Sequence, residues 1–569
     1  MLHGEKGFRK LSFKQKVSLL FRASPLFRTL LWIVIIAIVF VATKAASYKT
    51  QKIPVLTSIN PPIGTPGDIM IINGSNFGNT RGSSYVEIGG SKLTSSCYLD
   101  WNDSQVKVII PSNVQDGLVF VVSSHEKSNH LFFANENDIP SPVRPDPKKS
   151  IPIITTISKT TASVGDLITI EGSNYGNSRG TSAVYFSANH ETSDVTQDEY
   201  LPATDNDFDY ELWSDTEIRV RVPDGAKTGS CYVKTEKGQS NNISLSVQQS
   251  IGQKRYSNKH TYVVQLTADV ANAVSDGESG TITLRVPRPA VFSSQPRIEL
   301  AECIPTPIIE DYRNTIVHQI QLSNNTHSRV KFSQNFIITV YSFSTDINSR
   351  RVKPFSDKER KLYKSFTSAD KCVPSNDTDI IALSNAITGK ETNPYLKAKA
   401  IYNYLIDNYT LLHLVRTENL PLSEMLESKA GDAYDFAILY TALLRAADIP
   451  SLAIGGILVD SNSKCKKHWW TEFYIEGFGW VPVDVALGAG LEFTPFIQVN
   501  DAKSYYFGSV DSQHIAFSRG WNEVKPVIVN SKTVYKPRFY ALQSIWEESS
   551  SAAVSYSSLW NAPVILGIY

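Results

Sequence analysis

Cysteine is scarce in this chain, and the few cysteines present form no pattern. They stand singly, with no C-x-x-C pair, and their odd number excludes complete pairing within the chain; they are Cys97, Cys231, Cys303, Cys372 and Cys465. None has the spacing of a zinc site, so we expect neither a small disulfide-stapled domain nor a structural metal. No cofactor is expected either.

An excess of charge of one sign is also lacking. The 56 basic and 55 acidic residues leave a net charge of +1. No basic stripe follows the N-terminal segment, which argues against a nucleic-acid partner. Hydrophobic residues make up 42% of the 569 and charged residues 20%, a composition typical of folded domains. At roughly 100–200 residues per domain, the length predicts three to five units.

The N-terminal segment differs from the rest of the sequence. Residues 1–28 are basic, with Glu5 as the single acid, and an uncharged run follows from Thr29 to Thr43. We therefore predict a cytoplasmic segment at 1–28 and a membrane-spanning signal anchor at 29–46. The bulk of the chain would then lie outside the cytoplasm, in a periplasm or on a cell surface. A signal peptide cleaved after Ala45 is the alternative.

A repeat becomes visible when the chain is aligned with itself. The stretch IPVLTSINPPIGTPGD from Ile53 aligns without gaps with IPIITTISKTTASVGD from Ile151. Both copies continue with Gly-Ser-Asn-aromatic-Gly-Asn, then WNDSQVKVIIP or WSDTEIRVRVP, and then Ser-Asn. Alternating apolar residues with glycines at the turns predict a small β-sandwich in each copy.

These motifs resemble the IPT/TIG family of immunoglobulin-like domains. The resemblance implies two domains, at 51–137 and 151–249, that act as spacers or interaction modules. The second copy carries an acidic insert near 188–210, with Asp194, Asp198, Glu199, Asp205, Asp207 and Asp209. A calcium loop is conceivable there, but the pattern D-x-D-x-D-G is missing, which favours a solvated acidic loop.

A third stretch, at 256–350, is predicted to be a further β-rich domain. Its segments YVVQLTADV, GTITLRVPRP, IVHQIQLS and NFIITVYSF alternate as strands do. The strand end Arg-Val-Pro-Arg-Pro resembles the β-domain that often precedes transglutaminase-like cores in bacterial proteins.

After about residue 356 the period becomes helical, and four short motifs follow in order. The first two are GDAYDFA at 431–437, where Asp432 suits a helix N-cap, and LRAADIP at 444–450. The third and fourth are HWWTE at 468–472 and GWVPVD at 479–484, which predict a β-hairpin.

Together these motifs resemble the transglutaminase-like, or papain-like, superfamily, which implies an α+β core at 356–569. The family pattern places a cysteine nucleophile at the helix start, a histidine base on the next motif and an aspartate on the last. Here the positions hold Ala433, His468 and Asp484. A methyl group cannot attack a carbonyl, so the acyl-enzyme route is closed. An engineered Cys-to-Ala replacement would leave the same residue.

Three hypotheses follow. In the first, the core is a catalytically inactive module that binds a peptide, a protein or a cell-wall component. In the second, the chain is an envelope peptidase or acyltransferase that uses His468 and Asp484 with an unconventional nucleophile, for which Cys465 is a weak candidate. In the third, it is a surface adhesin that works through the IPT/TIG repeats.

Overall fold

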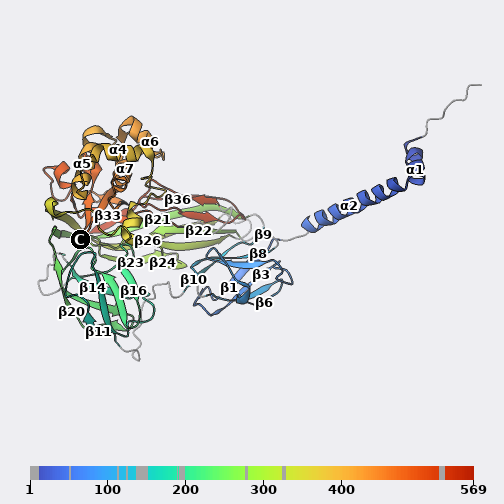
Figure 1. Cartoon of the computed structure of the whole chain (residues 1–569), viewed down its shortest axis with the longest axis horizontal. Coiled ribbons are helices and arrows are strands. Elements are labelled where there is room, and N and C mark those ends of the chain that lie inside the picture. Colours follow the sequence, from blue (N-terminus) through green and yellow to red (C-terminus); the bar gives the residue numbers. More distant parts are fainter. Residues whose placement is uncertain are drawn as a thin grey trace, which may run out of the picture.

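The computed structural model describes residues 12–49, 53–111, 114–123, 126–135, 151–188, 190, 199–275, 280–322, 328–524 and 532–569. Two N-terminal helices, α1 (Phe13–Ala23) and α2 (Pro25–Lys49), stand apart from the folded body (Figure 1). The predicted anchor at 29–46 falls within α2. In the described part of the chain, however, no helix meets the length and apolarity that a membrane crossing requires.

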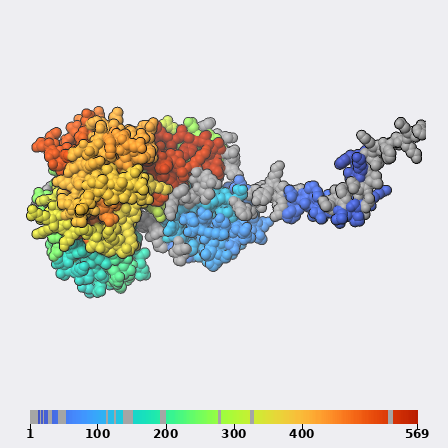
Figure 2. Space-filling model, turned by 45° about the horizontal axis from the view of Figure 1, so that its top comes forward, coloured from blue at the N-terminus to red at the C-terminus, as the bar shows by residue number. Residues whose placement is uncertain are grey.

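The first repeat folds as two facing sheets. One has the strand order β1-β3-β7-β6 and the other β2-β10-β8-β4-β5, with β9 added to β8. Its strands are β1 (Val55–Asn60), β2 (Ile63–Gly64), β3 (Ile69–Ser75), β4 (Tyr85–Ile88), β5 (Ser91–Lys92), β6 (Tyr98–Trp101), β7 (Gln105–Ile109), β8 (Gly117–Ser123), β9 (Glu126–Lys127) and β10 (Leu131–Asn135). Met70, Ile72 and Val106 meet in the core between the sheets. In Figure 2 this sandwich protrudes from the main body.

The second repeat has the same topology. Its sheets have the orders β11-β13-β17-β16 and β12-β20-β18-β14-β15, with β19 added to β18. The strands are β11 (Ile153–Ile157), β12 (Thr161–Ser163), β13 (Leu167–Ser173), β14 (Ala183–Ala188), β15 (Tyr200–Pro202), β16 (Tyr210–Trp213), β17 (Glu217–Arg221), β18 (Ala226–Thr235), β19 (Gly238–Gln239) and β20 (Ile243–Gln248). The shared glycine motif has a steric cause, because a Cβ on Gly74 or Gly172 would lie 2.0 Å from a carbonyl oxygen of the neighbouring strand in the same sheet.

The acidic insert is not a solvated loop at its C-terminal end. Asp207 and Asp209 are only 9% and 3% exposed, so that interpretation is wrong for these two residues. Asp194 and Asp198 lie outside the described residues. Trp480 and Arg519 of the core both donate hydrogen bonds of 3.0 Å to Oδ1 of Asp207. Asp207 at the C-terminal end of the insert therefore docks the second sandwich on the core.

The third β-rich stretch forms another pair of sheets, built on two long paired strands. These are β21 (Gly252–Ser275) and β26 (Ser328–Ile347), in the order β23-β26-β21-β36, and the facing sheet has the order β24-β25-β22-β35-β34. The other strands are β22 (Gly280–Pro287), β23 (Arg297–Ile304), β24 (Ile309–Tyr312), β25 (Thr315–Leu322), β34 (Lys532–Val534), β35 (Glu547–Ser549), β36 (Ala553–Trp560) and β37 (Val564–Ile568).

Four of these strands come from the C-terminal part of the chain, which we had assigned to the core at 356–569. β36 and β37 both pair with β21, and β35 pairs with β22. The assignment fails there because β21 and β22 each need a hydrogen-bonded neighbour on the side away from β26 and β25. The core is thus inserted into the third sandwich.

The core consists of helices packed on one antiparallel sheet of order β31-β30-β29-β33 (Figure 1). Its helices are α3 (Lys361–Thr367), α4 (Thr378–Thr388), α5 (Pro394–Asn408), α6 (Leu422–Ser428), α7 (Ala433–Ala446), α8 (Val485–Gly488) and α9 (Ala502–Tyr505). Its strands are β27 (Thr410–Leu411), β28 (Ala430–Gly431), β29 (Ser451–Val459), β30 (Cys465–Ile475), β31 (Gly479–Val483), β32 (Ser509–Val510) and β33 (His514–Arg519). α7 is the central, almost wholly buried helix, and β32 pairs with β26 of the third sandwich.

Candidate functional site

The first turn of α7 holds the vacant nucleophile position. Ala433 is the first helical residue and is 3% exposed. Asp432 caps the helix by accepting hydrogen bonds from the backbone N–H groups of Tyr434 (3.0 Å) and Asp435 (3.2 Å). Asp435 in turn accepts one from the N–H of Asp432 (3.0 Å), which completes a capping box. A side chain at position 433 therefore stands at the positive end of a well-formed helix.

Two arginines neutralise the acids of this cap. Arg538 donates to both carboxylate oxygens of Asp432, at 2.9 and 2.7 Å, and also pairs with Asp435. Arg416 pairs with Asp435 as well, and its backbone N–H donates to Asp432 (2.7 Å). Burial and the neighbouring Asp435 raise the pKa of Asp432. The guanidinium of Arg538 also lies 4.3 Å above the ring of Tyr434, so it covers the helix start.

β30 and β31 bring His468 and Asp484 together. His468 Nε2 donates to Asp484 Oδ2 over 2.5 Å, and both residues are fully buried. The other oxygen of Asp484 accepts from the backbone N–H of Leu487 (2.8 Å) and so caps α8. The second nitrogen of His468, Nδ1, has no hydrogen-bond partner among the described residues. Chemically, this is an imidazole oriented by a carboxylate with one nitrogen left over for proton transfer.

The helix and the strand pair adjoin each other. The ring of Tyr434, next to Ala433, lies 5.4 Å from the ring of Trp469, next to His468, in an edge-on contact. One turn further along α7, the carbonyl of Ala437 accepts a hydrogen bond from the hydroxyl of Thr471 (3.2 Å). The three sequence-predicted positions thus lie on elements in direct contact.

A second histidine, missed by the sequence analysis, belongs to the same cluster. His514, the first residue of β33, donates from Nε2 to the same oxygen Oδ2 of Asp484 (3.1 Å) and from Nδ1 to Asp511 (2.9 Å). Burial lowers the pKa of His514, but the neighbouring Asp511 and Asp484 outweigh it and raise this pKa to about 10. His514 in turn holds the pKa of Asp511 below its usual range, against the effect of burial. The only signal in the sequence is the short spacing from Asp511 to His514, which by itself does not place either beside Asp484.

Three atoms of this cluster could hold a metal ion, although we expected none. The ligand atoms of His468, Asp484 and His514 lie within 4.8 Å of one another. Asp511 on the far nitrogen of His514 is the kind of partner that orients metal-bound histidines. The same three atoms are already joined by hydrogen bonds, and an imidazolium at His514 offsets one of the two negative charges of Asp484 and Asp511. Burial lowers the pKa of His468, so this imidazole adds no positive charge, and one negative charge of the cluster is left without a counter-charge from its histidines.

The cysteines near the site are poor nucleophiles. Cys372 lies 3.6 Å from the hydroxyl of Tyr434, and burial raises the pKa of its thiol to about 12. Cys465 donates to the carbonyl of Pro563 (2.9 Å), and burial raises its pKa to about 11. Burial likewise raises the pKa of Tyr434. A thiolate or phenolate is accordingly rare at any of these positions at neutral pH.

Comparison with known families agrees with this geometry. Residues 381–485, from α4 to the start of α8, match the family model of the transglutaminase-like superfamily. This chain carries a transglutaminase-like core. Residues 54–136 match the IPT/TIG domain, which identifies the first sandwich.

Individual relatives cover only parts of the chain. An uncharacterized protein of Haemophilus influenzae is 29% identical over 182 residues, which are 26% of this chain and 48% of that protein. The chain thus spans about half the length of this relative. A cyclomaltodextrin glucanotransferase of Niallia circulans is 36% identical over 72 residues, 12% of this chain and 10% of the enzyme.

Two solved structures align with parts of the chain. A putative cysteine protease from Cytophaga hutchinsonii is 18% identical, with a TM-score of 0.34, over 56% of this chain and 91% of its own. The periplasmic domain of TgpA from Pseudomonas aeruginosa is 11% identical, with a TM-score of 0.23, over 39% of this chain and 87% of its own.

Proposed function

We propose that the transglutaminase-like core of this chain is a binding or scaffolding module that carries out no acyl transfer. One observation supports this more than any other: the first residue of α7, where the family has its cysteine, is Ala433. His468 and Asp484 would then be the base and orienter of a reaction that has lost its nucleophile. The ligand class proposed for the core is a peptide, a protein or a cell-wall component.

The state of the neighbouring groups supports the same proposal. Cys372, beside the hydroxyl of Tyr434, and Cys465, three residues before His468, both have raised thiol pKa values. Neither is therefore suited to replace the missing cysteine. The capping box and its two arginines are intact, and a helix start of this kind stabilises a thiolate. The surroundings of a nucleophile are present, and the nucleophile alone is missing.

Restoring the cysteine tests the proposal. Hydrolysis and amine transfer are measured on a panel of glutamine-containing peptides, for the chain as written and for Ala433→Cys. We expect the unmodified chain to show neither hydrolysis nor amine transfer on these peptides. Activity of Ala433→Cys that disappears in the double variant Ala433→Cys/His468→Ala would show that the remaining machinery is competent.

The opposite result is equally clear. If the chain as written turns over these peptides and His468→Ala abolishes that activity, the proposal is wrong and an unconventional nucleophile must exist. Trapping with an acyl electrophile, followed by peptide mapping, would identify it.

We further propose that the chain is held at a membrane by its N-terminal segment, with the bulk of the protein outside the cytoplasm. The basic residues up to Arg28 and the uncharged run from Thr29 to Thr43 support this location. The test is fractionation of cells that express the chain, with and without residues 1–49. Recovery of both forms in the soluble cytoplasmic fraction would refute it.

A further inference from the structure

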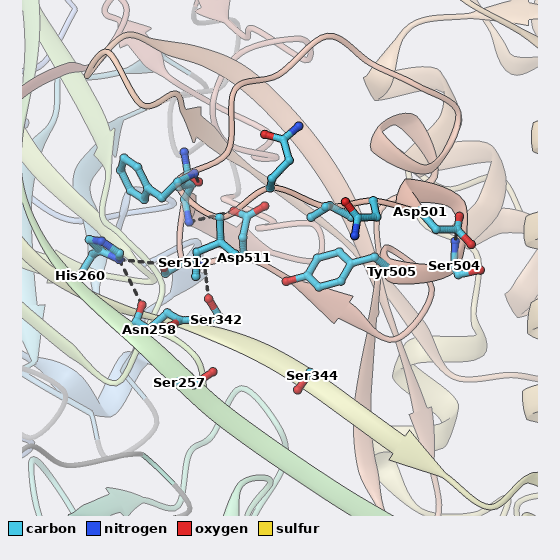
Figure 3. Close-up of a pocket in the computed structure, with 16 residues that line it drawn as sticks. Ser257, Asn258, His260, Ser342, Ser344, Asp501, Ser504, Tyr505, Asp511 and Ser512 are labelled. Atoms are coloured by element: carbon cyan, nitrogen blue, oxygen red, sulfur yellow. Dashed lines mark hydrogen bonds between the residues drawn. The ribbon is translucent and has the colours of Figure 1, made fainter.

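A pocket of about 540 Å³ lies between the third sandwich and the core, and Ala433 is not among the described residues that line it. Its walls come from β21, β26 and the core segment that runs from Phe496 to Gln513. Figure 3 shows His260 and Tyr505 approaching from opposite sides, with Asp511 and Ser512 between them. The volume falls within the range of roughly 300–1,000 Å³ that is usual for small-ligand sites.

Aromatic rings supply part of the pocket wall. The rings of His260 and Phe496 are stacked, with centroids 4.6 Å apart and planes 30° from parallel. The hydroxyl of Ser512 lies 2.8 Å from His260 Nδ1 and holds this ring in place. The ring of Tyr505 is fixed edge-on against Tyr506, at 4.9 Å. These rings offer flat, preorganised faces to a ligand.

Most of the other residues that line the pocket are polar and uncharged, and the remainder are Ile497, Val499 and two aspartates. Serine, asparagine and glutamine make up most of the wall, and neither lysine nor arginine occurs among the described residues that line it. Several of these side chains make no hydrogen bond within the described part of the chain, namely Ser257, Ser344, Gln498 and Asn500. They are free to act as donors and acceptors toward a ligand.

The two carboxylates of the wall are already engaged. Asp511 accepts hydrogen bonds from His514 Nδ1 (2.9 Å) and from the hydroxyl of Tyr506 (3.1 Å). Asp501 caps α9 by accepting from the backbone N–H of Ser504 (3.0 Å). Both carboxylates are thus already hydrogen-bonded within the protein. Since neither lysine nor arginine is among the described lining residues, the pocket offers an anionic ligand no such cation.

From this chemistry we infer that the pocket binds an uncharged saccharide. Hydroxyl and amide groups match the alternating donors and acceptors of a sugar, and the ring faces match its polarised C–H surfaces. An extended peptide fits less well along β26, because at the pocket this strand already pairs with β21 on one edge and with β32 on the other. It cannot gain a peptide as an added strand there. This inference goes beyond the binding function proposed above, because Ala433, His468 and Asp484 are not among the described residues that line this pocket.

Calorimetry with the full chain tests the assignment. The probes are cellohexaose, maltohexaose and chitohexaose as neutral saccharides, a hexagalacturonate as an anionic one, and a glutamine-containing hexapeptide. We expect saturable binding of at least one neutral hexasaccharide and weaker binding of the hexagalacturonate. Tyr505→Ala should weaken the neutral saccharide about tenfold, which corresponds to the loss of one aromatic contact.

Matched variants separate binding from folding. Gln498→Ala replaces an exposed side chain of the pocket and should also weaken binding, whereas Tyr535→Ala, at a tyrosine 56% exposed and outside the pocket, should not. The inference is overturned if no neutral saccharide binds, if Tyr505→Ala and Gln498→Ala both leave binding unchanged, or if only the hexapeptide binds. Turnover by the chain as written, measured on the same preparation, would instead overturn the proposed non-catalytic function.

Discussion

Asp207 in the second repeat accepts a hydrogen bond of 3.0 Å from the indole nitrogen of Trp480 in the core. The same oxygen accepts from Arg519, which also reaches Glu472 at 2.7 Å. Trp480 and Glu472 belong to the motifs by which the transglutaminase-like core is recognised. These motif residues therefore also fasten a neighbouring domain.

We expect Asp207→Ala to loosen this docking. The change leaves Trp480 and one side of Arg519 without a buried partner, at a cost of about 1–3 kcal/mol. Tryptophan fluorescence during urea unfolding measures this loss of stability, and limited proteolysis of residues 199–210 is a second readout. Asp205→Ala is the control, because that carboxylate is 64% exposed and pairs only with Arg179 among the described residues. Equal midpoints for both variants would contradict the docking role.

Arg538→Met should destabilise the start of α7. Methionine keeps the apolar stem over Tyr434 but leaves Arg416, among the described residues, as the remaining ion-pair partner of the two buried acids Asp432 and Asp435. Removing one partner of a buried ion pair costs up to about 3–5 kcal/mol. The free energy of unfolding of the core is measured in urea. Arg329→Met is the control, because this side chain is 75% exposed and pairs with Asp269. It should change the free energy of unfolding by about 0.5 kcal/mol or less. Equal effects of the two variants would show that the Arg538 ion pairs contribute little.

The stability of the core should fall as the pH rises from about 6.5 to about 10. Asp511 and Asp484 raise the pKa of His514 from 6.5 to about 10. A raised histidine pKa adds stability that is fully present below pH 6.5 and is lost as the pH rises through the folded-state value. The slope for one group is at most about 1.4 kcal/mol per pH unit.

The measurement compares unfolding free energies at pH 7 and pH 9.5 for the chain and for His514→Gln. We expect the variant to be less stable at pH 7 and to show a flatter dependence. His130→Gln is the matched control, since burial lowers the pKa of this histidine to about 3, and it stays neutral over the whole interval. An unchanged slope in His514→Gln would mean that the imidazolium is not the group that titrates.

The native thiols should react slowly with iodoacetamide at pH 7 in the folded protein. Burial raises the pKa of Cys372 to about 12 and that of Cys465 to about 11, so little thiolate is available. Ala433→Cys should add one fast-reacting thiol at the helix N-terminus. Mass spectrometry of peptides after timed alkylation distinguishes the sites. Labelling of Cys465 as rapid as that of the new cysteine would contradict the prediction that burial keeps this thiol unreactive.

Much of the fold could be predicted from local patterns. The alternation Ile218, Val220, Val222 and the repeated glycine motif predict the sandwiches, and the family match to the first repeat confirms its type. The helix start at Asp432 and the hairpin around Gly477 could be predicted because capping and turn formation depend on residues that are neighbours in sequence. The transglutaminase-like assignment is confirmed as well.

Contacts between segments far apart in the sequence could not be predicted from such local patterns. His514 joins Asp484 from 30 residues away, and Asp207 joins Trp480 from 273 away. The return of β36 to β21 spans nearly 300 residues and was missed for the same reason. An isolated histidine or aspartate has the same local sequence whether it ends up buried in a cluster or exposed to water.

The insertion of the core into the third sandwich has a consequence for how the protein is made. Thr261 exchanges backbone hydrogen bonds of 2.8 and 2.9 Å with Tyr569. During synthesis, β21 therefore emerges from the ribosome some 300 residues before the strands that cover its second edge. Until then that edge stays exposed to other chains. The two immunoglobulin-like repeats, made of local pairings, can fold early, whereas the third sandwich cannot close until its C-terminal strands have been made.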